Sequence, residues 1–159
     1  MPELNNQNFN HLKIHTQYSI CEGAIKIDNL KDFCKEKKIP CLGLSDTSNL
    51  CGALEFAENI SKVGTQPIIG TQIYFRFEDT TGLLPLIALN ENGYKKIIEL
   101  SSRSYLENDA LSDPHLDIKE LLKDIEGVSL LSGTIQGLFG KLFEKGRLDE
   151  ISKLYKSLS

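Results

Sequence analysis

Short apolar runs alternate with amphipathic segments along the whole chain, and this alternation is the feature that most constrains the fold. Nearly continuous apolar runs lie at 40–45, 67–75, 83–89 and 127–132, and a further extended segment is predicted at 9–15. Apolar strands of this kind between helices are typical of parallel βα units, whose sheet is covered on both faces. The sequence therefore predicts an α/β protein with parallel strands, either a TIM-like βα barrel or an open doubly wound sheet.

Helical spacing of apolar residues marks the segments between these runs. Leu54, Phe56 and Ile60, for example, are expected to form one apolar stripe. Asp28 and Asn90 are residue types that favour the N-cap position, so each is predicted to start a helix. The predicted helices cover 28–37, 49–62, a segment that begins at Asn90, 117–122, and two segments within 137–158 that separate near Gly146.

Composition limits the class of protein. The chain has 159 residues, which suits one domain, and its net charge of −4 argues against a domain that binds nucleic acid strongly by itself. The cysteines Cys21, Cys34, Cys41 and Cys51 lack zinc-site spacing, so we expect buried free thiols. The first residues are polar and no apolar run approaches the ~20 residues of a membrane span. We therefore expect a cytoplasmic protein.

The segment from His11 to His15 carries the first chemical signal. His11, Lys13 and His15 alternate with Leu12 and Ile14, and alternate residues of a strand share one face. Neutral imidazole is a common ligand of transition metals, whereas a lysine ammonium has three donors and no acceptor. We interpret the segment as a metal-site strand whose central ligand is replaced by a cation.

Several motifs follow one another in a fixed order. They are Asn10 to Ser19, Glu22 to Ala24, Leu44 to Phe56, Pro67 to Gln72, Ala88 to Tyr94 and Gly127 to Gly133. Together they resemble the PHP (polymerase and histidinol phosphatase) domain family, in the form found at the N-terminus of the alpha subunit of bacterial DNA polymerase III. The resemblance implies a distorted seven-stranded βα barrel that is longer than this chain. We therefore expect residues 1–159 to be the N-terminal part of a PHP domain, with an incomplete barrel and without the polymerase modules.

The resemblance also implies where metal ligands would lie. In metal-binding members the first strand carries His-x-His, and here the pair falls on Lys13 and His15, with His11 one step earlier. The second motif in such members reads Asp-His-Gly-Asn. In this chain Asp46 is present but Thr47 replaces the histidine. Two of these positions have therefore lost a ligand.

The remaining motifs point the same way. The third strand of metal-binding members ends in Gly-x-Glu, and Gln72 replaces that carboxylate; after the fifth strand, Thr134 replaces a cysteine. A two-metal phosphoesterase needs several carboxylates and imidazoles around its cations. We expect no cofactor, and instead a direct cluster of the Lys13 ammonium, the Asp46 carboxylate and the histidines. Binding of one weak divalent metal by His11, His15 and Asp46 is the alternative.

Three further residues attract attention. Glu22 follows the first strand, where it could join the site or cap a loop; Glu55 is read as a solvated charge and His115 as a surface residue. No nucleophile arrangement of the Ser-His-Asp or Cys-His type is supported. These residues therefore add no ligand set that would replace the missing one.

Three functions from different classes remain open. The resemblance implies a catalytically silent part of a replicative polymerase, which acts as a scaffold for the alpha subunit and as a docking surface for its proofreading exonuclease subunit. In that case DNA is bound only through the full-length protein. An active metal-dependent PHP phosphoesterase is the alternative, and a free-standing interaction protein is the third possibility.

An incomplete barrel makes one further prediction. Its first strand, 9–15, lacks a neighbour, and unpaired strand edges invite pairing with another chain. We expect the chain either to self-associate or to cover that edge with its C-terminal helices, 137–158.

Overall fold

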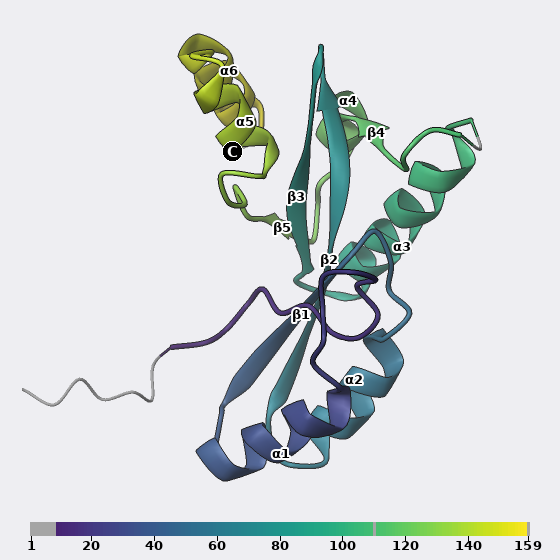
Figure 1. Cartoon of the computed structure of the whole chain (residues 1–159), viewed down its shortest axis with the longest axis vertical. Coiled ribbons are helices and arrows are strands. Elements are labelled where there is room, and N and C mark those ends of the chain that lie inside the picture. The colour runs from purple at the N-terminus through teal and green to yellow at the C-terminus, as the bar shows by residue number, and fades with distance from the viewer. Residues whose placement is uncertain (1–8, 110, 159) are drawn as a thin grey trace, which may run out of the picture.

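The computed structural model describes residues 9–109 and 111–158, which form an α/β protein around one sheet. The strand order is β1-β2-β3-β5, and β4 pairs with β2 away from this path. The sheet is open within the described residues, which agrees with the expected partial barrel (Figure 1). The strands are β1 (Cys41–Thr47), β2 (Gln66–Phe77), β3 (Thr80–Ala88), β4 (Leu116–Asp117) and β5 (Val128–Leu130). The helices are α1 (Ile27–Lys37), α2 (Ala53–Ser61), α3 (Glu91–Leu106), α4 (Ile118–Lys123), α5 (Leu138–Glu144) and α6 (Leu148–Leu158).

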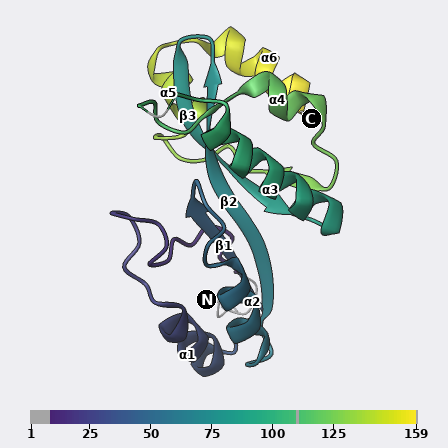
Figure 2. The ribbon, with the colours of Figure 1, turned by 90° about the vertical axis from the view of Figure 1, so that its right-hand side faces the viewer.

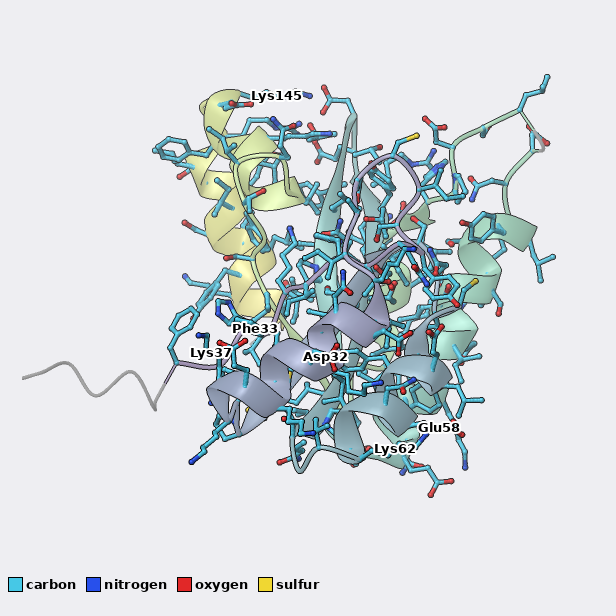
Figure 3. The ribbon with its side chains drawn as sticks, turned by 60° about the horizontal axis from the view of Figure 1, so that its bottom comes forward. Asp32, Phe33, Lys37, Glu58, Lys62 and Lys145 are labelled. Atoms are coloured by element: carbon cyan, nitrogen blue, oxygen red, sulfur yellow. The ribbon has the colours of Figure 1, made fainter. Side chains whose placement is uncertain are left out.

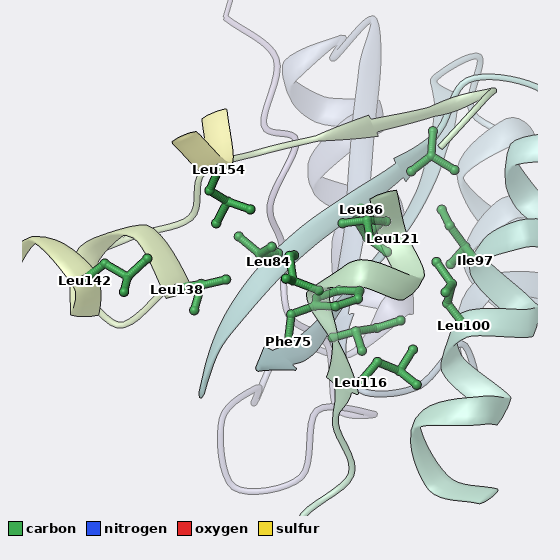
Figure 4. Packing of buried hydrophobic residues seen from close by; sticks show 13 residues of the cluster. Phe75, Leu84, Leu86, Ile97, Leu100, Leu116, Leu121, Leu138, Leu142 and Leu154 are labelled. Atoms are coloured by element: carbon green, nitrogen blue, oxygen red, sulfur yellow. The ribbon is translucent and has the colours of Figure 1, made fainter. Parts of the chain in front are cut away.

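The long strand β2 connects two hydrophobic clusters. In Figure 2 it runs from the half with α1 and α2 to the half with α3, α4, α5 and α6. Ile27, Leu42 and Phe56 belong to the first cluster. The second cluster gathers around Phe75 between the sheet and its helices (Figure 4). Leu50 packs against both clusters, so the two halves share one continuous apolar interior.

The strand directions are mixed, and the expectation of parallel strands throughout is wrong in this detail. β1 pairs with β2 in parallel, as does β4, whereas β2–β3 and β3–β5 are antiparallel. Only Glu78 and Asp79 separate β2 from β3. A connection this short can join only antiparallel neighbours, since a parallel crossover needs a dozen or more residues.

The segment 9–15 is not a regular strand. It lies beside β1, where Gly43 N donates to His11 O at 2.7 Å and Ser45 N donates to Ile14 O at 2.8 Å. The two-residue step from Gly43 to Ser45 in β1 therefore corresponds to a three-residue step from His11 to Ile14 in the segment. The extra residue acts as a bulge and interrupts the predicted alternation of side chains between His11 and Lys13.

Of the two predicted N-caps, Asn90 is confirmed, whereas Asp28 is wrong because it lies in the first turn of α1 and Lys26 is the N-cap. Asn90 caps α3 by accepting a hydrogen bond from Gly93 N at 2.9 Å. The break between α5 and α6 coincides with Gly146, whose φ of 71° suits glycine. Leu54 was expected in the core, but it is 72% exposed because α2 buries Ala53, Phe56 and Ile60 instead. The outer faces of α1 and α2 carry Asp32, Phe33, Lys37, Glu58 and Lys62 (Figure 3).

Helix α5 lies on β3 and α6 packs on α5, rather than along the segment 9–15, so that part of the expectation is wrong (Figure 1). Arg147, in the turn between α5 and α6, forms ion pairs with Glu78 and Asp79 at the tip of the β2–β3 hairpin. Lys141 Nζ donates to Thr81 O at 2.8 Å. These polar contacts and the burial of Leu138 fix the helices to the hairpin.

The four cysteines are free thiols, as predicted, but their burial differs from the prediction. Cys34 is buried and Cys41 is half-buried. Cys21 and Cys51 are exposed because both lie in turns rather than in core-facing elements.

Candidate functional site

Asp46 is the buried anchor of the candidate site. It lies in β1 next to the strand's C-terminal end, and its side chain has no solvent exposure. Its Oδ1 accepts hydrogen bonds from Thr16 N at 2.6 Å and from Ser19 Oγ at 2.7 Å. Its Oδ2 accepts one from Thr16 Oγ1 at 2.8 Å. The carboxylate is thus held by neutral donors of the turn that follows the segment 9–15.

A second chain of hydrogen bonds runs across the neighbouring strand ends. Thr47 and Gln72 are register partners in the β1–β2 pair, and Gln72 Nε2 donates to Thr47 Oγ1 at 2.6 Å. Thr47 Oγ1 in turn donates to the carboxylate of Glu22. His15 Nδ1 lies 3.9 Å from Glu22 Oε2. These contacts bring residues from two strands and one loop into a single polar group.

Three of these residues, His15, Glu22 and Gln72, line a cavity of about 250 Å³. Lys13 and His15 come from the first segment, Gln72 from β2, and Thr134 from the loop before α5. The remaining lining residues are Glu22, Leu83, Pro85, Gly133, Gln136 and Gly137. Four positions singled out in the sequence, Lys13, His15, Gln72 and Thr134, therefore meet at one place.

His11 lies elsewhere, and its expected place beside His15 is wrong. It is exposed and packs edge-on against Phe9, with ring centroids 4.7 Å apart. With Ile14 and Phe33 it lines a separate apolar hollow beside α1. The bulge described above explains the difference, since one extra residue turns His11 away from the face that Lys13 and His15 share.

The expected ion pair between Lys13 and Asp46 is also absent from the described part of the chain. No carboxylate of residues 9–109 and 111–158 lies within 4.0 Å of Lys13 Nζ. The hydroxyl groups of Thr16 and Ser19 supply the donors of Asp46 instead. The sequence signal for this was available, because Thr16 and Ser19 follow His15 closely and hydroxyl residues in turns often bond to nearby polar groups.

The other candidate residues have ordinary partners. Glu55 accepts a hydrogen bond from Tyr18 Oη at 2.6 Å, so it is not merely a solvated charge. That contact raises the pKa of Tyr18. His115 lies in an exposed loop, where its Nδ1 is 2.8 Å from Asp113 O, in keeping with the prediction of a surface residue. Glu22 joins the polar group through Thr47, which favours the site interpretation over that of a loop cap.

The surroundings of His15 disfavour the charged form of its imidazole. Burial lowers the pKa of His15, and the nearby Lys13 ammonium lowers it further, against the opposing influence of Glu22 and Asp46. A neutral imidazole could ligate a metal, but the other groups around the cavity do not complete a ligand set. Among the described residues, no group of three His, Cys, Asp or Glu side chains is arranged to hold a metal ion. The residues at this place therefore do not fit a metal centre of the two-metal type.

The chain is similar in sequence to known proteins along most of its length. A family model for the PHP domain matches residues 11–159. DNA polymerase III subunit alpha of Caulobacter vibrioides is 37% identical over 161 residues, an alignment that covers 96% of this chain and 14% of that protein. The same subunit of Rickettsia felis is 35% identical over 134 residues, with 84% of this chain and 11% of that protein covered. The chain thus spans only a small part of the length of these relatives.

Among solved structures, an amidohydrolase from Chromobacterium violaceum aligns with a TM-score of 0.47 at 13% identity, covering 92% of this chain and 54% of that one.

In the described part of the chain, no helix combines the length and the hydropathy that crossing a bilayer requires.

Proposed function

The chain belongs to the PHP domain family, and from this premise we propose that it forms part of the alpha subunit of DNA polymerase III as a catalytically silent domain. Its identity to two alpha subunits, 37% and 35%, supports this assignment. The chain spans 11 to 14% of those proteins, and we propose that it is the N-terminal part of their PHP domain. Nucleotide chemistry and DNA binding then belong to the rest of the polymerase, and the isolated chain has neither activity.

The donor set of the cavity carries the proposal of catalytic silence. Lys13, Thr47, Gln72 and Thr134 occupy positions at which the family resemblance implies metal ligands, and they offer no carboxylate or imidazole. Asp46 retains its carboxylate, but three hydrogen bonds already engage both of its oxygens. A hydrolytic metal pair would lack the negative charge that offsets its cations and the ligands that position water.

Turnover of a generic aryl phosphate tests this proposal. The chain is dialysed against Mn²⁺ or Zn²⁺, its metal content is measured by elemental analysis, and hydrolysis is followed by absorbance. We expect less than one bound metal per chain and no turnover above buffer. Two or three metals with phosphatase turnover would instead establish the active phosphoesterase.

The positive role that we propose is that of a scaffold for the polymerase and a docking surface for the proofreading exonuclease subunit. An apolar hollow beside α1 supports a docking role, because Ile25 and Phe33 on its rim are 44% and 41% exposed. Phe33→Ser should weaken binding of the purified exonuclease subunit in titration calorimetry. Phe143→Ser is the matched control, since Phe143 is 66% exposed on α5. Equal binding by both variants and the original chain would exclude this hollow.

We propose in addition that the chain self-associates. Within the described residues β5 pairs only with β3, and Leu89, Leu130 and Tyr155 line a groove that includes residues of β5. Free strand edges beside apolar surface favour pairing with a second chain. Sedimentation at micromolar concentration should therefore detect dimers or larger species, and a strictly monomeric chain would contradict this.

A further inference from the structure

Two buried acceptors of the cavity have no partner among the described residues. They are Gln72 Oε1 and His15 Nδ1. Gln72 is only 2% exposed, and its other side-chain atom, Nε2, is already bonded to Thr47. Buried polar atoms without a partner are rare in folded proteins because they lose their hydration without compensation. The cavity therefore requires a group that donates hydrogen bonds.

Three polar side chains of the cavity lining lie in one hydrogen-bonded neighbourhood, namely Glu22, Gln72 and His15. The bond from Gln72 to Thr47 and the bond from Thr47 to Glu22 hold the amide and the carboxylate in one group. Glu22 in turn lies 3.9 Å from His15 Nδ1, which has no partner among the described residues. The lining thus offers a carboxylate, an amide carbonyl and an imidazole nitrogen. Three acceptors of this kind match the three N–H donors of an ammonium group.

Lys13 supplies such a group in the same cavity. Its side chain lines the cavity and, within residues 9–109 and 111–158, its Nζ has no ion-pair partner. We propose that the cavity is a cation site for an ammonium group, and that the Lys13 ammonium is its resident cation in place of metal ions. This role requires rotation of the flexible Lys13 side chain, since Nζ contacts neither Gln72 Oε1 nor His15 Nδ1 in this structure. The inference rests on the proposed loss of metal chemistry.

Charge and donor type separate this ligand from the alternatives. An anion would meet the Glu22 carboxylate and leave Gln72 Oε1 without a donor. A divalent metal would find one carboxylate and would be repelled by Lys13. A monovalent cation with N–H donors is attracted by the Glu22 carboxylate and also supplies a donor for Gln72 Oε1. Tethering this cation to the chain lowers the entropic cost of its binding.

Chemical rescue tests the proposal. Lys13→Ala removes the resident cation, and ethylammonium chloride then offers a free one. Tetramethylammonium chloride at the same concentration is the matched control, because it has the same charge but no N–H donor. We expect a lower Tm for Lys13→Ala, and recovery of most of the loss by ethylammonium only. A Tm equal to that of the original chain, or an equal response to both salts, would overturn the proposal.

A second measurement covers the case in which Lys13→Ala does not fold. In the original chain, NMR should show slow exchange of the Lys13 Nζ hydrogens, in contrast to Lys95, whose side chain is 68% exposed. Exchange as fast as that of Lys95 would overturn the proposal. Phosphatase turnover would refute the silent function, whereas a silent chain without rescue or protected hydrogens would refute only the lysine site.

Discussion

Replacement of Asp46 by alanine is the perturbation whose effect the structure defines most closely. Three donors converge on the carboxylate, namely Thr16 N, Thr16 Oγ1 and Ser19 Oγ, and both donor residues are at most 1% exposed. In Asp46→Ala the two hydroxyl groups can turn to other acceptors, but the backbone N–H of Thr16 cannot. Burial of that N–H without a partner lowers the free energy of unfolding further, beyond the loss of the hydrogen bonds to the carboxylate.

The expected cost follows from those contacts. Hydrogen bonds to charged groups contribute about 1.5–3 kcal/mol each, and an unsatisfied buried donor costs about 1–3 kcal/mol. Because the hydroxyl groups recover part of their bonding, we expect a net loss of about 3–5 kcal/mol in the free energy of unfolding. For a chain of this size that loss corresponds to a fall in Tm of roughly 6–20 °C. Asp46→Asn should lose less, because it retains one carbonyl oxygen for Thr16 N and Ser19 Oγ.

Urea unfolding monitored by circular dichroism, with and without EDTA, provides the assay. We expect the same loss in both conditions, because Asp46 acts through hydrogen bonds and not through a metal. If EDTA removed the difference between Asp46→Ala and the original chain, Asp46 would be a metal ligand, in contradiction to this expectation.

Three further predictions concern other parts of the molecule. The pKa of His15 is lowered in the folded chain, so its contribution to stability is complete above its unfolded pKa of about 6.5 and is lost as the pH falls through the folded value. In urea titrations at several pH values, His15→Gln should remove this loss of stability at low pH. The control variant His115→Gln should keep the pH dependence that His15 causes. Arg147→Ala should lower the free energy of unfolding by about 1 kcal/mol, because its ion pairs with the hairpin tip are partly exposed, and raising the salt concentration should reduce the difference. A Cβ at Gly93 would lie 1.7 Å from Gly127 O, so Gly93→Ala should cost about 2–4 kcal/mol in thermal unfolding, and an unchanged Tm would contradict the packing of α3 on β5.

The sequence predicted features that depend on local chemistry. Asn90 carries its own capping oxygen, and Gly146 carries its own freedom to adopt a positive φ, so neither needs information from the rest of the fold. The hairpin direction at Glu78 and Asp79 was equally local but was missed, because the apolar runs of β2 and β3 look the same in parallel and antiparallel sheets.

The site shows a different limit. Alternation along the first segment correctly predicted that Lys13 and His15 share one side, where both line the same cavity. Because of one extra residue, His11 instead lines the separate apolar hollow beside α1. Such a bulge depends on how the segment matches Gly43 and Ser45 of β1, which periodicity alone cannot show. Thr16 and Ser19 were visible as hydroxyl residues after His15, but their bonds to Asp46 depend on how this turn lies beside β1, which periodicity does not show.

Thermal unfolding with and without Mn²⁺ tests the central claim most directly. The original chain is compared with a triple variant, Lys13→His, Thr47→His and Gln72→Glu, which introduces the ligands that the family resemblance implies for metal-binding members. We expect no change in the Tm of the original chain and a rise for the triple variant, since a ligand that binds only the folded state at 100 times its Kd adds about 2.7 kcal/mol. A metal-dependent rise in the Tm of the original chain, abolished by EDTA, would contradict the claim that this cavity has lost its metal centre.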